Sequence, residues 1–585
     1  MNSNSCFQTS LGLIALVALS VAFFTSPLDG EKSLSGYIVQ GGDYELVVNA
    51  VAATGAEVTH ELPVIKALGV KLTAEELRML QDYYPALRIH ANAVAETAAR
   101  KKARGTTDQT SNTSDEGVAG DAYSDYPALV DADQLHAQGI TGDGVGVAIV
   151  DSGIYTGPGL SGDTRENSRI MAAYDARTDR VTTGYYSKRK GYSGLSEFDN
   201  DDSGHGSHVA SAGFNSKLSN VGKYNGIAPD ADLVSIKVFD ADGRGTYADV
   251  IRGVQWAIDN AATYNIRIIN MSLSATAQSH YWDDPLNQAV MAAWDAGIIV
   301  VASAGNSGPE AQTIGVPGNV PYIITVGAMT DNNTPADLSD DRLARFSAAG
   351  PTFEGFVKPE IIAPGGHIMA AMQDDSQIAL AHPEFHDGAS FFSMSGTSQA
   401  ASIVSGIAAL ILQAEPGLSP DQVKCKIMSG ARPALKSDGS LAYSIFQQGA
   451  GLANAHDSVY AANYDCANNG LDVKADLDGS MHFGGRANQR ESGEFYLMEQ
   501  DGYLWRNGAA SGQGYLWKNG YLWKNGYLWQ NGYLWTNNVR ADGYLWRNSH
   551  AESSGYLWQN GYLWQNGYLW TNAESASINH WVEQE

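Results

Sequence analysis

Positive charge is scarce in this chain. It has 37 lysines and arginines against 64 aspartates and glutamates, which gives a formal net charge of −27 over 585 residues. Proteins that bind nucleic acid need a basic face, so the imbalance argues against a nucleic-acid partner. A large net charge of one sign instead suits a soluble protein that resists aggregation.

Cysteine is also scarce, with only Cys6, Cys425 and Cys466. The absence of a CxxC pair and of any Cys/His cluster argues against a structural zinc site. Cys6 lies in a segment that we expect to be removed. Cys425 and Cys466 could form a disulfide in an oxidising compartment or remain two separate buried thiols, and their spacing alone does not decide.

No stretch approaches the 18 consecutive apolar residues of a membrane span. Leu11–Phe24 is a run of 14 mostly apolar residues, which is short for a membrane span and typical of a signal-peptide core. The first 31 residues contain no lysine or arginine, and no clear A-x-A cleavage site follows. We predict a signal peptide at 1–27 and a secreted or cell-surface-associated protein; an uncleaved anchor is the alternative.

A small mixed unit is predicted over residues 35–95. YIVQ (37–40) is typical of a strand, 45–53 of a helix and 58–72 of paired strands. Residues 73–84 predict a helix in which Thr73 is the N-cap and Glu76 has the capping-box spacing. The polar stretch 96–122 has no apolar period and is predicted to be a linker that proteases can reach.

Residues 123–462 alternate short apolar runs with helical periods. Because these runs lack polar alternation, they predict parallel strands buried on both faces, as in an α/β fold. In such sheets ligands bind at the carboxyl ends of the strands. The runs are 145–150, 232–239, 266–273, 297–304 and 322–328, and predicted helices between them cover 247–261 and 284–297.

The C-terminal part is repetitive. Residues 463–501 are predicted to be a linker and 573–585 a short tail, and GYLW occurs nine times in 502–572, mostly as GYLWxN. Each unit offers strand-prone residues followed by Asn-Gly, a hairpin signal, while a six-residue period also suits a solenoid. A meander, a solenoid and a mostly unfolded repeat all remain open.

Four polar motifs lie at predicted strand ends and helix starts. Asp151 follows the apolar run VAIV, His205 stands between glycines before a helical run, and Asn306 lies in the turn AGNSG. SMSGTSQAAS (393–402) holds four serines just before a long apolar run. A serine nucleophile needs a base, an orienting carboxylate and donors for the oxyanion, and these motifs offer all three.

Taken in the order Asp, His, Asn, Ser, these motifs resemble the subtilisin-type serine peptidases, or subtilases. The family pattern G-T-S-x-A falls on Gly396–Ala400, which selects Ser398, and stretches 283–308 and 346–365 resemble the AprX-like bacterial branch. The resemblance implies a three-layer αβα domain with a mostly parallel sheet over 123–462. Ser398 would then open a helix whose free N–H groups favour a developing anion.

The resemblance also implies roles for the four residues. Ser398 would attack the scissile carbonyl, and His205 would take its proton and pass it to the leaving amine. Asp151 would hold the imidazole in one tautomer. The Asn306 side chain and the Ser398 backbone N–H would stabilise the oxyanion. No cofactor is expected for this chemistry, although structural calcium, whose ligands we cannot assign, is common in the family.

Protein or peptide substrates are the partners that follow. The family binds an extended peptide along two segments, and the matching residues carry no acidic group that would demand a basic substrate side chain. We therefore expect broad endopeptidase activity biased toward apolar or aromatic residues before the cleaved bond. The matching residues are Gly243, Arg244 and Gly245, then Ser272, Leu273 and Ser274, with Ala302–Gly305 (which includes Ala304 and Gly305) and Ser307 lining the specificity pocket.

The 35–95 unit resembles the inhibitor-like prosegment of these enzymes. It would template folding, inhibit the site and be removed by autocleavage within 96–122, which makes the chain a zymogen. A permanent accessory domain is the alternative reading. Similar GYLW tails follow the catalytic domain in some bacterial subtilases, where the regular aromatics could bind a cell surface or polysaccharide or simply pack on one another.

The chain departs from the family at two positions, with Ser207 where threonine is usual and Ser402 where proline is usual. We expect His208 to be a packed, hydrogen-bonded histidine rather than a second base. Asp201 and Asp202 could shape the specificity pocket, but we interpret them as solvated loop charges. Asp476–Gly479 faintly resembles a calcium loop and lacks the rest of the ligand set.

Two other functions are alternatives to the peptidase. A surface-adhesion protein would use the GYLW repeats and keep the peptidase-like domain only as a scaffold, and the four intact motif residues argue against it. A lipase or esterase would carry a G-x-S-x-G elbow, which is absent.

Overall fold

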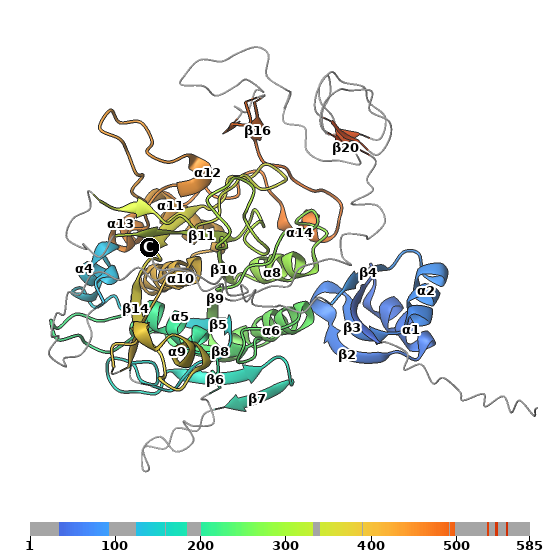
Figure 1. The fold of residues 1–585 in the computed structure, drawn as a ribbon, viewed down its shortest axis with the longest axis horizontal. Helices are drawn as coiled ribbons and strands as arrows, with labels where there is room; N and C mark the ends of the chain where they lie inside the picture. The colour runs from blue at the N-terminus through green and yellow to red at the C-terminus, as the bar shows by residue number, and fades with distance from the viewer. Residues whose placement is uncertain are drawn as a thin grey trace, which may run out of the picture.

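The computed structural model describes most of residues 34–497 and three short strands near the C-terminus (Figure 1). The expected signal peptide, the 96–122 linker and most of the repeats lie outside these residues. The described ranges are 34–92, 124–157, 159–183, 200–331, 340–388, 390–490 and 492–497, with the backbone of 535–536, 545–547 and 557–559.

A nine-stranded sheet forms the centre of the described chain, in the order β12-β11-β10-β9-β5-β8-β6-β7, with β13 also paired to β11. Neighbouring strands run parallel except at β7 and β12, which are antiparallel. The predicted parallel sheet is confirmed. Its strands are β5 (Gly146–Asp151), β6 (Ile170–Asp175), β7 (Arg180–Thr183), β8 (Asp232–Lys237), β9 (Ile266–Met271), β10 (Ile299–Ser303), β11 (Ile324–Thr330), β12 (Arg342–Leu343) and β13 (Ile361–Pro364).

Two pairs of helices cover this sheet. Helices α6 (Tyr247–Asp259) and α8 (Pro285–Asp295) pack together, as do α5 (His205–Phe214) and α10 (Thr397–Ala414), so that helix, sheet and helix form three layers. Because helices cover the central strands, β5 is buried at every position. The remaining helices of this domain are α3 (Tyr126–Leu129), α4 (Ala132–His136), α7 (Ala261–Tyr264), α9 (Gln377–Ala381), α11 (Pro420–Ser429), α12 (Ile445–Gln448) and α13 (Ala455–Tyr460), beside the hairpin β14 (Ile368–Ala371) and β15 (Phe391–Met394).

Helix α10 is the core helix of the domain. Among the described helices it alone has the length and apolar composition of a membrane span, with a mean hydropathy of 1.3, but 89% of it is buried inside the protein. This burial identifies it as a helix of the interior, and its first turn carries Thr397 and Ser398.

The N-terminal unit folds as predicted, into two helices on an antiparallel sheet of order β2-β3-β1-β4. Thr73 and Glu76 form the expected capping box, since the Thr73 side chain accepts from the Glu76 N–H while Glu76 accepts from the Thr73 N–H. The elements are β1 (Ser35–Gln40), α1 (Tyr44–Thr54), β2 (Glu57–Leu62), β3 (Ala67–Leu72), α2 (Ala74–Tyr83) and β4 (Arg88–Ala91).

The two faces of this small sheet have different neighbours. Val39 and Val70 belong to the core that the sheet shares with α1 and α2, whereas Ile38 and Leu62 belong to the core of the large domain. Alternate residues of a strand point to opposite faces, so the second face of the small sheet lies on the large domain, next to α6 and α8 (Figure 1).

Residues 463–497 are folded rather than a linker, and the prediction for this stretch is wrong. They contain α14 (Val473–Leu477), β16 (Ala487–Gln489) and β17 (Phe495–Leu497), and a disulfide joins Cys466 to Cys425 on α11. The sequence alone did not decide whether these two cysteines form a disulfide. Tyr281 and Tyr322 both donate to a buried Asp476 carboxylate oxygen, at 2.6 and 2.7 Å, which fixes α14 against the domain.

Three GYLW units have described strands, β18 (Trp535–Thr536), β19 (Leu545–Arg547) and β20 (Leu557–Gln559). They pair in parallel, with Trp535 opposite Trp546 and Trp546 opposite Trp558. Parallel pairing is the arrangement of a solenoid and not of an antiparallel meander, so among these three strands the meander is excluded. Binding of a cell surface or polysaccharide by the repeats stays a prediction.

Candidate active site

The fold brings Asp151 and His205 together. Asp151 is the last residue of β5 and His205 the first residue of α5, and His205 Nδ1 lies 2.7 Å from Asp151 Oδ1 with both side chains fully buried. Among the described residues, the other ring nitrogen, Nε2, has no hydrogen-bond partner. An imidazole held at Nδ1 with Nε2 open is the arrangement of a general base.

A buried carboxylate holds the start of α5 in place. Asp201 Oδ1 accepts from the Ser152 hydroxyl at 2.8 Å and the Gly204 N–H at 2.9 Å. Asp201 Oδ2 accepts from the Ser207 N–H at 2.8 Å and from its hydroxyl at 2.5 Å. The interpretation of Asp201 as a solvated loop charge is therefore wrong, whereas its neighbour Asp202 is largely exposed, as expected.

Ser398 is the second residue of α10 and is 2% exposed. Its hydroxyl donates to the Ser272 carbonyl at 3.2 Å, while the Ser272 hydroxyl donates to the Ser398 carbonyl at 2.8 Å. These reciprocal hydrogen bonds fix the first turn of α10 against the end of β9. In this arrangement the Ser398 hydroxyl is turned to Ser272 and not to His205.

A contact one turn along the helices ties the starts of α5 and α10 together. The Ser402 hydroxyl donates to the Val209 carbonyl at 2.5 Å. Ser402 follows Ser398, and Val209 follows His205, by four residues each, which is about one helical turn. The serine at this position therefore makes a specific contact that proline could not make. Ser207, the other departure, donates to Asp201 and accepts from the Tyr155 N–H.

Asn306 and the Ser398 N–H border one small space. Asn306 Oδ1 accepts from the Thr397 N–H at 3.0 Å and the Thr397 hydroxyl at 2.8 Å, which turns the Asn306 NH₂ away from Thr397. A methyl group on Gly396 would lie 2.8 Å from Gln399 Oε1, 3.5 Å from Asn306 Nδ2 and 3.7 Å from Ser398 N. The two donors are suited to an oxyanion, which would displace the Gln399 side-chain oxygen from this point. Thr397 belongs to the serine motif Gly396–Ala400, but the sequence alone did not predict that it orients Asn306.

His208 is a buried structural histidine, as predicted. Its Nε2 lies 2.9 Å from the Phe392 carbonyl and 3.1 Å from the Ile368 carbonyl, so this nitrogen carries the proton. Nδ1 lies 3.3 Å from Gln399 Nε2. Burial lowers the pKa of His208 to about 4, which keeps the ring neutral near pH 7.

The expected substrate segments lie at different distances from the nucleophile. Ser272 contacts Ser398 directly, and the Gly305 N–H donates to the Thr397 hydroxyl at 3.2 Å. No hydrogen bond among the described residues joins Gly243–Gly245 to Ser398. This turn precedes α6 and is connected to the His205 loop through Gln377, which donates to the neighbouring Asp242 at 2.8 Å and to the Asp202 carbonyl at 3.0 Å. Leu273, Ala304 and Gly305 are buried.

The described residues contain no cluster of three or more His, Cys, Asp or Glu side chains that could hold a metal ion. Asp476, in the stretch that resembles a calcium loop, is occupied by Tyr281, Tyr322 and His482. These contacts give the Asp476 carboxylate a structural role, and structural calcium stays an untested prediction.

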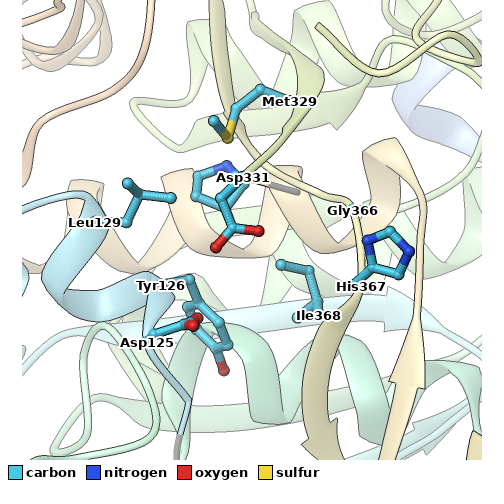
Figure 2. A pocket seen from close by; sticks show the side chains of 9 residues that line it. Asp125, Tyr126, Leu129, Met329, Asp331, Gly366, His367 and Ile368 are labelled. Atoms are coloured by element: carbon cyan, nitrogen blue, oxygen red, sulfur yellow. The ribbon is translucent and has the colours of Figure 1, made fainter. Parts of the chain in front are cut away.

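A pocket lies beside α3, apart from the four motif residues (Figure 2). Asp125, Asp331 and His367 are among the residues that line it. Burial and the nearby Asp331 charge raise the pKa of Asp125. The pocket is lined by neither His205 nor Ser398, so it is separate from the candidate catalytic residues.

A parallel sheet with a carboxylate–imidazole pair at one strand end, and a serine at the head of a buried helix, defines a class of serine hydrolase. Comparison with known proteins identifies the family, because residues 142–452 match the subtilase family. The chain belongs to the subtilase family and is a serine protease of the subtilisin type.

Its relatives are proteases. Serine protease AprX of Bacillus subtilis (strain 168) is 42% identical over 329 residues, which are 55% of this chain and 68% of the relative. A thermostable alkaline protease of Halalkalibacterium halodurans is 28% identical over 437 residues, 74% of this chain and 97% of the relative. Fervidolysin from Fervidobacterium pennivorans, a keratinolytic enzyme related to subtilisin, shares the fold with a TM-score of 0.52 at 21% identity, over 74% of this chain and 62% of the other.

Proposed function

We propose that the chain is a secreted endopeptidase made as a zymogen, in which Asp151, His205 and Ser398 form the catalytic triad. The fully buried Asp151–His205 pair, at 2.7 Å and with Nε2 open, is the observation that carries this proposal. Such a pair has no structural use for an open nitrogen, whereas a general base requires one.

The proposed reaction begins when the Ser398 hydroxyl leaves the Ser272 carbonyl and turns toward the substrate and His205. Ser398 Oγ attacks the scissile carbonyl carbon as His205 Nε2 takes its proton, and Asp151 stabilises the imidazolium. The carbonyl oxygen becomes an oxyanion between Asn306 Nδ2 and the Ser398 N–H. His205 then protonates the leaving amine, and water, deprotonated by the same nitrogen, hydrolyses the acyl-enzyme.

The N-terminal unit supports the zymogen part of the proposal. The Asn92 side chain accepts from the Ala248 N–H at 3.1 Å, in the first turn of α6. This contact places the end of the described unit next to the turn Gly243–Gly245, where substrate is expected. A chain that continues from there can occupy the substrate segments and inhibit the enzyme until 96–122 is cut. A signal peptide at 1–27 would deliver this zymogen out of the cell.

Casein hydrolysis and intact mass test the proposal on the full chain. We expect the wild type to digest casein and to lose its N-terminal unit by autocleavage, whereas Ser398→Ala should do neither and remain full length after removal of the signal peptide. Ser393→Ala, a nearby serine on β15, is the matched control and should behave as wild type. Autocleavage or casein digestion by Ser398→Ala would contradict the proposal.

A further inference from the structure

We propose that Ser274 restricts the substrate residue before the cleaved bond to small side chains, with alanine and serine preferred. This inference rests on the proposed function, because it concerns the specificity of the same site. It also narrows the expectation from sequence, which favoured apolar or aromatic residues at that position.

Two segments form the wall beside the nucleophile. The first, 272–275, begins at Ser272, whose hydroxyl donates to the Ser398 carbonyl at 2.8 Å. The second, 304–306, includes Gly305, whose N–H donates to the Thr397 hydroxyl, and Asn306. The side chain of the substrate residue that carries the attacked carbonyl must enter between these segments, since Ser398 and Asn306 fix where that carbonyl lies.

Ser274 already stands in that space. A methyl group on Gly305 would lie 2.8 Å from Ser274 Oγ, and one on Gly315 would collide with the same hydroxyl. The Ser274 Cβ is farther away but still in contact, at 3.5 Å from the first methyl position and 3.2 Å from the second. Because Cβ is fixed by the backbone, rotation of the hydroxyl does not clear the gap between the two glycines.

The backbone that carries Ser274 is held on both sides. The Ala275 N–H donates to the Val316 carbonyl at 2.9 Å, and the Val316 N–H donates back to the Ala275 carbonyl at 2.7 Å. On the other side the Ser303 hydroxyl donates to the Leu273 carbonyl at 2.9 Å. These three hydrogen bonds prevent the segment from moving aside to admit a larger side chain.

The chemistry of the gap is mildly polar. Glycine backbones supply two of its sides, and Ala304, Ile314 and Ala348 form a small apolar cluster next to it. The Ser274 hydroxyl makes no hydrogen bond to the residues that the structure describes, so it can pair with a substrate hydroxyl. A short side chain fits beside Ser274, and serine gains a hydrogen bond, whereas an aromatic ring would overlap Ser274 Cβ.

Four peptide p-nitroanilides that differ only in the last residue, Ala, Ser, Leu or Phe, test this inference on the processed enzyme. We expect the wild type to favour Ala over Phe in kcat/KM by about tenfold or more. Ser274→Gly should raise kcat/KM for Phe by roughly 10–100-fold and leave that for Ala within about threefold. Ser274→Ala, which keeps Cβ, should still favour Ala over Phe but lose the advantage of Ser.

Two further variants protect the test against a folding defect. Adding Gly315→Ala to Ser274→Gly refills the gap from the opposite wall and should restore the preference for Ala. Ser274→Val narrows the gap further and should lower kcat/KM for Leu and Phe more than for Ala. Reaction with a fluorophosphonate counts the active sites in each preparation, so that rates are compared per competent enzyme.

The results separate the two proposals. A wild type that reacts with the fluorophosphonate but favours Phe, or a Phe:Ala ratio that Ser274→Gly leaves unchanged, would overturn the role of Ser274 and leave the peptidase intact. Absence of both fluorophosphonate reaction and hydrolysis of all four peptides would overturn the proposed function itself.

Discussion

The candidate catalytic centre and the interface with the N-terminal unit are both rich in polar side chains, but the interface also includes an exposed ion pair. At the centre, His205 and Asp151 are fully buried. At the interface, Arg88 pairs with Asp283 at 3.1 Å while both side chains are about half exposed. Buried polar groups are costly to leave without partners, whereas exposed ion pairs contribute little. The difference suits a permanent site and a unit that is later released.

The interface nevertheless has an apolar centre. Ile38, Leu62 and Ile65 of the small unit belong to the main hydrophobic core. The same interface holds buried polar contacts: Gln40 Nε2 donates to Gln288 Oε1 at 2.5 Å, and His60 Nε2 lies 3.0 Å from Asp249 Oδ1, with those two side chains only 10% and 11% exposed. Together with the exposed Arg88–Asp283 pair, this mixture of apolar and polar contacts is compatible with a protein–protein interface.

Substitution of Asn306 should give the largest effect among the following variants, because it removes a donor from the buried centre. Asn306→Ala is expected to lower kcat by about 10²–10³-fold, equivalent to about 3–4 kcal/mol of barrier, with little change in KM. Thr397→Val, which removes only one of the contacts that orient Asn306, should cost less. An unchanged kcat per fluorophosphonate-reactive site in Asn306→Ala would contradict the assignment of the oxyanion donors.

The disulfide should come next. Cys425 and Cys466 are separated by 41 positions in the sequence, and removing a cross-link of this loop length typically costs about 2–4 kcal/mol. The double variant Cys425→Ser/Cys466→Ser avoids a free thiol and should unfold at a lower temperature, while kcat/KM at 25 °C should change little because neither residue borders the site. Calorimetry in the Ser398→Ala background avoids autolysis. An unchanged unfolding temperature would contradict a stabilising role of the Cys425–Cys466 disulfide.

Two adjacent aspartates, Asp283 and Asp284, allow an exposed and a buried carboxylate to be compared within one loop. Asp284 accepts from the Leu286 and Asn287 N–H groups at the start of α8 and is 1% exposed, and its burial raises its pKa to about 7. Since the folded state binds this proton more tightly than the unfolded chain, the associated stability is present below about pH 4 and is lost as pH rises through 7.

We therefore expect the free energy of unfolding of Asp284→Asn to change less between pH 4 and 8 than that of its parent. The difference between the two changes should be about 1–3 kcal/mol. Asp283→Asn, the exposed neighbour, should reduce the pH dependence much less, because the Asp283 charge only adds to the effect of burial on the Asp284 pKa. Thermal unfolding of the full chain in the Ser398→Ala background measures both. If the stability of Asp284→Asn and of its parent changed equally with pH, burial would not raise the pKa of Asp284 as proposed.

The exposed interface pair should give the smallest effect. Arg88→Ala removes a contact worth about 0.2–1 kcal/mol, so processing and release of the N-terminal unit should accelerate by less than about fivefold. The difference from wild type should shrink in high salt, because exposed charges are screened. A time course of intact mass at low and high salt provides the measurement. A large, salt-independent effect of Arg88→Ala would contradict the distinction drawn between the two regions.

The sequence predicted those parts of the site that local pattern controls. Asp151 could be placed because the apolar run before it predicts a buried strand, and Ser398 because a long apolar helix follows it. Asp201 could not be understood in the same way, because its donor Ser152, 49 positions away, approaches it only in the folded chain. Ser274 was assigned to the substrate segment, but its position between Gly305 and Gly315 depends on how three loops meet.

The same limit explains the error in residues 463–497. The sequence there is polar and has little apolar period, which favours a linker. Its anchors are instead buried hydrogen bonds from Tyr281 and Tyr322 to Asp476, together with the Cys425–Cys466 disulfide. Long-range contacts of this kind leave no periodic signal in the local sequence.

Identification of the serine that reacts with a fluorophosphonate tests the central claim most directly. The processed enzyme would be labelled, digested and analysed by peptide mass spectrometry. We predict a single adduct on Ser398, formed quickly at neutral pH and strongly slowed in His205→Ala. An adduct on Ser393, Ser395 or Ser402 in place of Ser398, or equal labelling with and without His205, would contradict the account.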